Sequence, residues 1–359
     1  LREREIVLDS APHICWPLRF VLPHDAGQRP AWMIRVGLFL YDHLARRRRL
    51  PRSTAVDLRA HPAGQPLESR YTKGFVYSDA WVDDARLVVL TAMDAHEHGA
   101  TVLTRTRCTK LAPRGDRWAV TLRRDDGREL AIEARTVVNA TGPWVDRFLD
   151  GATPVPARRH PRMVKGSHIV VPRLFEHEFA YLFQSPDGRI VFAIPYEGDY
   201  TLIGTTEMDY TGDLARPAIA ETEVEYLLAL ANRYFSSDLA RKDVVWTFAG
   251  LRPLLADPKD PATSLTRDYV LDLNTDGPPL LSIYGGKLTT YRKLAEDVID
   301  TLAPHLGCSA RAWTAGQPLP GGDMPRADFE AFFRGLLARY RGLPSNLLHR
   351  YARAYGTRA

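Results

Sequence analysis

The sequence predicts an α/β protein in which an antiparallel sheet is inserted between two α/β segments of one domain. The α/β part is indicated by two apolar runs, 137–139 and 281–284, which each end in a turn of small residues that leads into a predicted helix. The insertion is indicated by short segments between these runs, in which apolar and polar side chains alternate at close spacing. A length of 359 residues agrees with two or three domains.

The helices follow from periodicity and from the residues that interrupt it. A short helix is expected at the start of the chain, followed by an irregular segment up to residue 24, which contains three prolines. Pro30 begins an apolar helix over 31–45, and Gly99 ends a helix over 83–99. Further helices are expected after residue 144, at 221–235, at about 289–304 and in the basic tail after 306.

The strands are rich in Val, Ile, Thr and aromatic residues and are bounded by turn signals such as Asp126-Gly127 and Asp187-Gly188. A proline-rich linker at 153–161 separates the first group of strands from the second. The strands are expected at 74–82, 101–111, 117–123, 129–139, 167–172, 180–184, 190–195, 200–205, 244–250, 269–273 and 280–284.

Composition excludes several classes of protein. Cys15, Cys108 and Cys308 are odd in number and form no C-x-x-C pair, so we expect reduced thiols in the cytosol rather than a disulfide framework or a zinc site. The net charge of +5 lies at the ends, because residues 1–60 hold 11 basic and 6 acidic side chains and residues 301–359 hold 8 and 3. This distribution does not indicate a nucleic-acid partner, and no run is long and apolar enough to span a bilayer.

Two turns are candidates for ligand contact, although G-x-G-x-x-G, Walker, H-E-x-x-H and G-x-S-x-G motifs do not occur in the sequence. Small residues at Thr141-Gly142 would let a ligand approach the backbone at a strand end, and a tight strand-to-helix turn is the alternative explanation. Gly285-Gly286-Lys287 exposes amides at a helix N-terminus and adds a positive charge, which suits an anion or an electron-rich ring edge. The alternative there is a glycine turn with a solvated lysine.

Three cationic side chains stand at the ends of predicted strands: His168, Arg252 and Arg267. An arginine fork suits a phosphate or a carboxylate because it donates two parallel hydrogen bonds. Each arginine alone is also explained by a surface ion pair, and sequence spacing does not show that the three side chains converge.

Several segments resemble the FAD-dependent glycerol-3-phosphate dehydrogenases of the aerobic bacterial respiratory type. They occur in the order that the family has, and they include N-A-T-G-P-W-V at 139–145, K-G-S-H-I-V-V-P at 165–172 and G-G-K-L-T-T-Y-R-K-L at 285–294. The other similar segments are 31–35, 41–44, 77–79, 81–87, 203–207, 244–247, 250–254 and 266–269.

The resemblance implies a glutathione-reductase-like, Rossmann-type FAD-binding domain that carries an inserted antiparallel substrate domain. The family's first strand and G-x-G-x-x-G turn bind the ADP half of FAD and do not occur in this sequence, so we expect it to be the central portion of such an enzyme. The implied domains are a partial FAD-binding domain (1–160), a substrate-binding domain (161–265), a return segment of the FAD domain (266–305) and the start of a C-terminal helical domain (306–359).

The resemblance also implies a reaction, the oxidation of sn-glycerol 3-phosphate to dihydroxyacetone phosphate with hydride transfer from C2 to flavin N5. His168 is the expected base for the C2 hydroxyl proton because a near-neutral pKa suits proton transfer, and Lys287 is the alternative base. No metal is expected. The other implied contacts are with substrate at Arg252, Arg267, Thr205 and Thr206, and with flavin at Thr141, Gly142, Gly285, Gly286, Lys287, Leu288 and Thr289.

The implied partners are a quinone, an anionic membrane surface on the cytoplasmic side and, compatible with the family, a second copy of the chain. The apolar helix 31–45 with Arg46–Arg49 fits attachment to that surface, and a buried helix with a solvated basic loop is the alternative. Two other functions stay open, an oxidase that passes electrons to oxygen and a fragment that binds phosphorylated ligands or lipid without catalysis. Peroxide production and flavin absorbance, respectively, would distinguish them.

Overall fold

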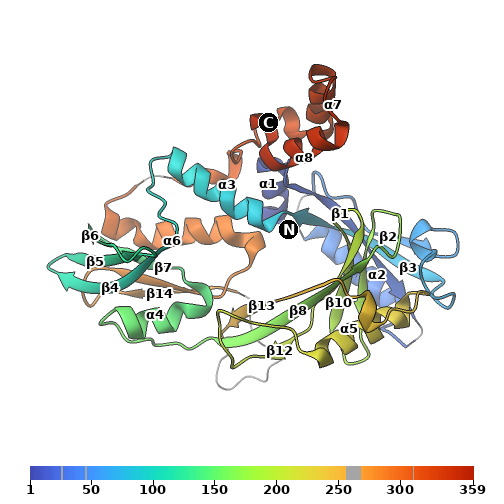
Figure 1. Ribbon diagram of the computed structural model, residues 1–359, viewed down its shortest axis with the longest axis horizontal. Helices are drawn as coiled ribbons and strands as arrows, with labels where there is room; N and C mark the ends of the chain where they lie inside the picture. The colour runs from blue at the N-terminus through green and yellow to red at the C-terminus, as the bar shows by residue number, and fades with distance from the viewer. Residues whose placement is uncertain (26, 45–46, 256–267, 310) are drawn as a thin grey trace.

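A computed structural model of the chain describes residues 1–25, 27–44, 47–255, 268–309 and 311–359. Figure 1 shows two lobes, one built on a large sheet and the other on small sheets covered by helices. The helices α7 (Phe329–Arg339) and α8 (Ser345–Tyr355) form a pair that projects from the body beside α1 (Arg2–Ser10). The predicted combination of an α/β part with an antiparallel insertion is confirmed.

The large sheet joins strands from two separate parts of the sequence, residues 15–82 and 162–254. Among the described residues it has nine strands, and β13 (Trp246–Leu254) pairs with β8 on a branch outside the main order. That order is β12 (Met208–Asp209), β8 (Arg162–Pro172), β11 (Tyr200–Gly204), β10 (Ile190–Tyr196), β9 (Ala180–Gln184), β1 (Cys15–His24), β3 (Lys73–Val82) and β2 (Thr54–Asp57). The segment before residue 83 therefore extends the same sheet as the segment after 161.

Strand β1 corrects the expectation that residues 11–24 are irregular. It pairs antiparallel with β3 along its whole length and parallel with β9 only at Phe20 and Val21. Pro17 and Pro23 lie outside this doubly paired stretch, where a missing N–H donor interrupts one ladder at most. The prolines thus lie in the parts of a strand that have one partner strand, and they do not mark a loop.

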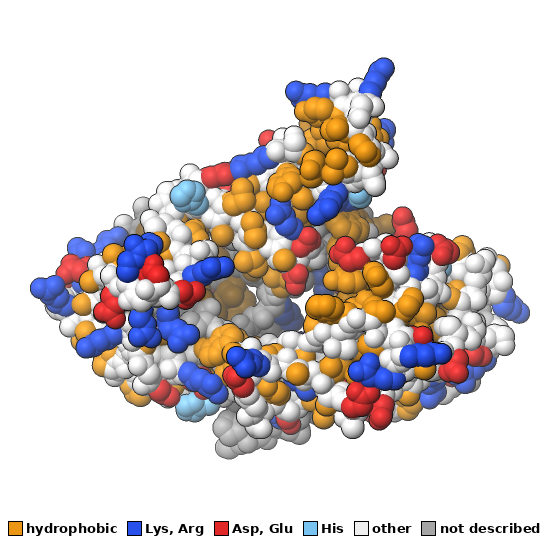
Figure 2. Space-filling model, viewed as in Figure 1, with side chains coloured by type: hydrophobic (Ala, Val, Ile, Leu, Met, Phe, Trp, Pro, Cys, Tyr) orange, Lys and Arg blue, Asp and Glu red, His pale blue; other side chains and the backbone are white. Residues whose placement is uncertain are grey.

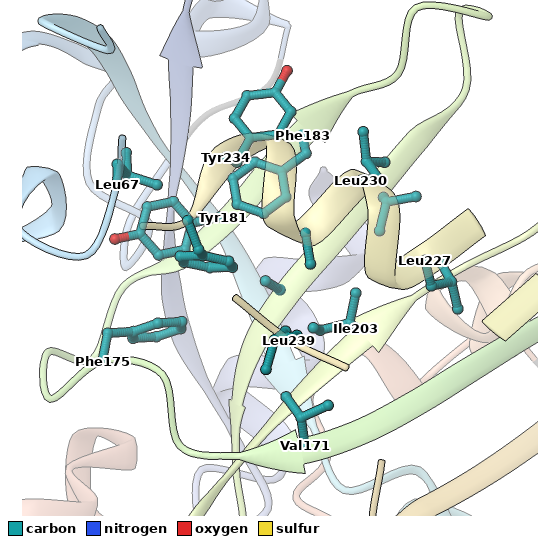
Figure 3. Packing of buried hydrophobic residues seen from close by; sticks show 14 of the residues in the cluster. Leu67, Val171, Phe175, Tyr181, Phe183, Ile203, Leu227, Leu230, Tyr234 and Leu239 are labelled. Atoms are coloured by element: carbon teal, nitrogen blue, oxygen red, sulfur yellow. The ribbon is translucent and has the colours of Figure 1, made fainter. Parts of the chain in front are cut away.

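The main core lies between the large sheet and α5 (Glu221–Tyr234), as Figure 3 shows. The helix buries Val224, Leu227, Ala231 and Tyr234, whose spacing of three or four residues places them on one face. The Tyr234 ring stacks on Phe183 of β9 with 4.1 Å between the ring centroids. This packing holds the large sheet in place, and two of its strands, β8 and β13, carry residues of the candidate site.

The second lobe contains a sheet in the order β14 (Val270–Asn274), β15 (Leu280–Tyr284), β7 (Val137–Asn139), in which β7 and β15 are parallel. A separate meander consists of β4 (Thr106–Arg114), β5 (Arg117–Arg124) and β6 (Glu129–Ala134). The buried Trp118 of β5 donates its Nε1–H to the Pro279 carbonyl at 3.1 Å, which ties the meander to the start of β15. The helices of this lobe are α3 (Asp84–Glu97), α4 (Val145–Ala152) and α6 (Tyr291–Leu306).

The apolar helix α2 (Ala31–His43) lies on the surface, so the buried-helix alternative is wrong. Trp32 is 68% exposed and Phe39 is 53% exposed, whereas Asp42 is buried. The Asp42 carboxylate accepts hydrogen bonds from Ser53 N and Oγ and pairs with Arg47 at 3.0 Å, which anchors the end of the helix. None of the helices in the described ranges has the length and apolar character needed to cross a membrane.

We expect Leu227→Ala to lower the free energy of unfolding by about 2–5 kcal/mol, because it removes a fully buried side chain and leaves a cavity in the main core. Urea unfolding followed by circular dichroism measures the change. Val88→Ala on α3, where Val88 is 63% exposed, is the control and should change the midpoint little. Equal effects of the two substitutions would show that α5 does not form the main core.

Candidate active site

Two turns that are far apart in the sequence meet where β7 and β15 end. Ser282 is the register partner of Asn139, and the Asn139 Nδ2 atom donates to Ser282 Oγ at 3.4 Å and to the Val145 carbonyl at 2.9 Å. Because the two strands are parallel, their carboxyl ends open on the same side. The turn at Thr141-Gly142 and the turn at Gly285-Gly286 therefore lie next to each other.

Both turns expose backbone that only glycine adopts easily. Gly142, Gly285 and Gly286 have φ angles of +58°, +74° and +106°. A Cβ atom placed on Gly142 would meet no atom within 4 Å, so the peptide there borders open space. The Thr141 hydroxyl donates to Asn139 Oδ1 at 2.7 Å, which holds the first turn.

The helix after the second turn begins at Tyr291, slightly later than the expected start at about residue 289. Lys287 is extended and exposed, a single 3₁₀ turn (Leu288–Thr290) follows, and α6 begins at Tyr291. Leu288 and Thr289 line a small cavity together with Arg4 and Asp79, which form an ion pair at 3.1 Å. The amides of this segment, and not those of α6 itself, border the turn.

The imidazole of His168 is held between two neighbouring strands of the large sheet. It stacks on Phe248 of β13, with 4.8 Å between the ring centroids and 11° between the planes. On the other side it lies against Gly204 of β11, where a Cβ atom would be 2.1 Å from His168 Cδ2. Only glycine at 204 leaves room for this ring.

The pKa of His168 is lower than predicted. Enclosure of the ring is the larger cause and the nearby Arg252 guanidinium is the second, and together they lower the pKa to about 4. The expectation of a near-neutral pKa is therefore wrong, because the sequence shows neither the packing nor the neighbouring cation. His168 is neutral at physiological pH and has a free lone pair to accept a proton.

Arg252 and Thr205 lie beside His168. A Cβ atom placed on Gly166 of β8 would lie 2.5 Å from Thr205 Oγ1 and 3.7 Å from an Arg252 Nη atom, so both side chains cross over this glycine. Arg252 Nη1 pairs with Glu207 Oε1 at 3.3 Å, and the Arg252 side chain is 43% exposed. A partly exposed guanidinium next to a neutral imidazole suits an anionic substrate that has a hydroxyl group.

Thr206 is not placed to contact substrate, contrary to the prediction from the sequence. Its side chain is buried, its hydroxyl donates to Glu223 Oε1 at 2.6 Å, and it accepts a hydrogen bond from Ser167 N at 2.9 Å. The hydroxyl is therefore used inside the protein and not for substrate. Arg267 lies outside the described residues.

The two halves of the site are adjacent. β13 packs against the short helical turn Gly142–Trp144, and a Cβ atom placed on Gly285 would lie 3.7 Å from the Pro253 carbonyl, one residue after Arg252. Figure 1 shows β8 and β13 extending from the large sheet toward the second lobe, and Figure 2 shows a hollow between the lobes. His168, Arg252 and the turn at Gly285-Gly286, which leads to Lys287, thus lie near one another between the two lobes.

Sequence reasoning missed Phe248, Gly204 and Glu223. Phe248 and Gly204 act through cross-strand register with His168, which depends on pairings between segments up to 80 residues apart. Gly204 had a usable signal, since a glycine inside an apolar strand often marks close approach of another group. Glu223 resembled an ordinary acidic residue in the first turn of a helix.

The fold and the site define a flavin-dependent oxidoreductase, because glycine turns with positive φ angles at neighbouring parallel strand ends fit a flat anionic cofactor beside a neutral imidazole. The chain belongs to the DAO family of FAD-dependent oxidoreductases, which matches residues 1–292. The predictions of the family, of an enzyme and of FAD as its cofactor are confirmed.

Individual relatives and one solved structure show which enzymes of this family the chain is similar to. The chain is 50% identical to a glycerol-3-phosphate dehydrogenase of Pseudomonas aeruginosa and 47% identical to a D-erythritol 1-phosphate dehydrogenase of Brucella abortus, and in both matches all of this chain aligns with 70% and 72% of the relative. The glycerol-3-phosphate dehydrogenase of Bacillus halodurans, solved with FAD, has a TM-score of 0.80 at 29% identity over 99% of this chain and 66% of that chain. The chain thus spans about two thirds of that solved structure.

We expect the low pKa of His168 to make stability depend on pH between about 6.5 and 4. The unfolded histidine has a pKa near 6.5, so in this window the unfolded chain binds more protons and stability falls as the pH is lowered. Urea unfolding at pH 7, 5.5 and 4.5 measures the slope. His168→Gln should flatten it relative to the wild type, with the remainder due to groups such as the buried His13, whose pKa is also lowered to about 4.

His305→Gln on the exposed side of α6 is the control for this substitution and should keep the wild-type slope. If His168→Gln keeps that slope as well, the imidazole is not enclosed as described.

Proposed function

We propose that the protein oxidises sn-glycerol 3-phosphate at C2 to dihydroxyacetone phosphate. The observation that carries the proposal is the pairing of a neutral histidine with a partly exposed arginine beside the glycine turns of a flavin site. Support comes from the relatives, two of which, from Pseudomonas aeruginosa and Escherichia coli, are named glycerol-3-phosphate dehydrogenase and are 50% and 46% identical to this chain.

In this mechanism Arg252 binds the substrate phosphate and Thr205 contacts a substrate oxygen. His168 Nε2 accepts the proton of the C2 hydroxyl, since Nδ1 is buried within the described part of the protein. When bound along the Thr141–Gly142 and Gly285–Thr289 segments, FAD supplies the acceptor for the hydride that leaves C2. Lys287 and the amides of its turn favour negative charge on that side of the site.

D-Erythritol 1-phosphate is the second candidate substrate. The relative from Brucella abortus that is named for it is 47% identical over the whole chain, a value close to those of the glycerol-3-phosphate dehydrogenases. Both molecules combine a phosphate with a neighbouring secondary alcohol, so Arg252 and His168 suit either one. The comparison of their kcat/KM values decides between them.

We expect Arg252→Ala in the FAD-loaded enzyme to raise KM for glycerol 3-phosphate on the order of 10- to 100-fold, because a charge-assisted hydrogen bond contributes about 1.5–3 kcal/mol. Oxidation of unphosphorylated glycerol, followed by reduction of an artificial acceptor dye, should change much less. Arg241→Ala is the control, because Arg241 is also an exposed arginine in an ion pair, with Glu221 at 2.7 Å, but lies away from His168. Equal losses for both substrates would assign Arg252 to folding or flavin binding.

The electron acceptor is proposed to be a quinone at a membrane surface to which the protein attaches peripherally. The support is α2, which presents Trp32, Met33, Val36, Phe39 and Leu40 to solvent, and the neighbouring Leu44, which is 74% exposed. Such a set of apolar side chains inserts into the interface of a bilayer. An oxidase that returns electrons to oxygen remains the alternative and would release hydrogen peroxide in the assay.

We expect the arginines after α2 to contribute only weakly to this attachment, because ion pairs within the protein offset part of their charge. Arg46 lies outside the described residues, Arg47 is buried against Asp42, and Arg48 and Arg49 both pair with Asp9. Asp42 offsets the charge of Arg47, and the single carboxylate of Asp9 offsets one of the two charges of Arg48 and Arg49. Attachment should therefore depend mainly on apolar insertion and only weakly on anionic lipid.

We expect Trp32→Ser to reduce binding to phosphatidylcholine vesicles by about tenfold or more, since burial of apolar surface contributes about 25 cal/mol per Å². Vesicle co-sedimentation measures the fraction bound, and added anionic lipid should change it little. Trp313→Ser is the control, because Trp313 is 50% exposed but lies after α6. Binding that needs anionic lipid and ignores Trp32 would contradict insertion through α2.

A further inference from the structure

A buried carboxylate lies beneath the group formed by His168, Thr205 and Arg252. Glu223, in the first turn of α5, is 3% exposed. Its Oε1 atom accepts hydrogen bonds from Ser167 Oγ at 2.9 Å and from Thr206 Oγ1 at 2.6 Å. Its Oε2 atom pairs with Lys165 Nζ at 2.7 Å and accepts from Ala220 N at 2.8 Å.

Ser167 and Thr206, whose hydroxyl groups donate to Glu223, are each next in sequence to a residue of the candidate site. Side chains of a strand alternate between its two faces, so Ser167 points to Glu223 while His168 points to the opposite face. In the same way Thr206 bonds to Glu223 while Thr205 lies over Gly166 on the side of Arg252. One carboxylate therefore fixes two backbone segments whose neighbours border the substrate.

The two segments are also tied to each other. Thr206 N donates to the Ser167 carbonyl at 3.2 Å, and Ser167 N donates to Thr206 Oγ1 at 2.9 Å. These bonds continue the pairing of β8 with the chain just beyond the last residue of β11, Gly204. Without a carboxylate at 223, the hydroxyl groups of Ser167 and Thr206 would lose their common acceptor.

The network stabilises the charged form of Glu223. Burial raises the pKa of this carboxyl, but hydrogen bonds from Lys165, Thr206, Ser167 and the Ala220 amide outweigh it, and the pKa is lowered overall. Lys165 is itself buried and donates to the Ala218 carbonyl at 2.8 Å. A fully satisfied buried network of this kind rigidifies the groups that it joins.

We propose that Glu223 is a positioning residue of the active site, which sets the distance between His168 and Thr205 and thereby the placement of the reacting alcohol. This inference rests on the proposed function. Glu223 touches neither substrate nor flavin, and it acts through Ser167 and Thr206. Misplacement of a reacting group by about 1 Å can reduce a rate on the order of 10²-fold, so the network matters for turnover as well as for folding.

The test compares Glu223→Gln with Glu221→Gln in the FAD-loaded enzyme. Both make the same change in the first turn of α5, but Glu221 is exposed and pairs with Arg241. Glu223→Gln should lower kcat for glycerol 3-phosphate on the order of 10²-fold, with FAD binding unchanged and with the assay kept well below the unfolding midpoint. Glu221→Gln should keep the wild-type kcat. Loss of stability with an unchanged kcat in the Glu223 variant would overturn the proposal.

Two milder variants keep the proposal testable if Glu223→Gln does not fold. Thr206→Val and Ser167→Ala each remove one donor and leave the pair of Lys165 and Glu223 in place. Either should lower kcat by more than it raises KM, and wild-type kinetics in both variants would overturn the proposal.

A spectroscopic measurement separates this inference from the proposed function. If the wild type oxidises neither polyol phosphate, the proposed function fails, and the His168 ring signals in a nuclear magnetic resonance spectrum still test the positioning. Removal of the Glu223 charge should shift these signals, whereas Glu221→Gln should not. Unshifted His168 signals in every Glu223, Thr206 and Ser167 variant that folds would refute the positioning role.

Discussion

The site depends on the parallel pairing of β7 with β15. Only three residue pairs form it, yet it joins chain segments that are more than 140 positions apart and places two glycine turns on one edge. Asn139 reinforces the pairing from within, because its amide bonds to Ser282 and to the start of α4. The strands that carry His168 and Arg252 lie between β7 and β15 in the sequence, and the large sheet to which they belong is completed by β1, β2 and β3 from before β7.

A second constraint acts on the side chain of His168. Gly204 and Phe248 enclose the His168 ring from opposite sides, which removes water from it and favours the neutral form. The same enclosure limits the ring to one orientation, in which Nδ1 is buried and the Arg252 guanidinium is nearby. Packing therefore sets both the protonation state and the orientation of the His168 ring, and it leaves Nδ1 buried without a hydrogen-bond partner among the described residues.

The sequence predicted those parts of the fold and site that depend on local features. The glycine turns, most strands and the apolar helix could be recognised because turn chemistry and periodicity are encoded within a few residues. The strand at Cys15–His24 was missed because its prolines are tolerated only in view of where β9 stops. Other features depend on long-range packing, which residue spacing does not reveal. Thr206 is buried against Glu223 whereas Thr205 is not, and Arg47 pairs with Asp42.

Arg252 connects these constraints, because it is paired with Glu207 and also lowers the pKa of His168. An ion pair this exposed contributes little, about 0–1 kcal/mol, so a phosphate can replace or join the carboxylate at small cost. A bound phosphate dianion opposes the charge of Arg252, and the repulsion between the guanidinium and a protonated imidazole falls. The proposed mechanism therefore makes His168 a weak base in the absence of an anion and a stronger base when the substrate phosphate is bound to Arg252. In the proposed mechanism, Arg252 thus links binding of the substrate phosphate to the ability of His168 to accept the C2 hydroxyl proton.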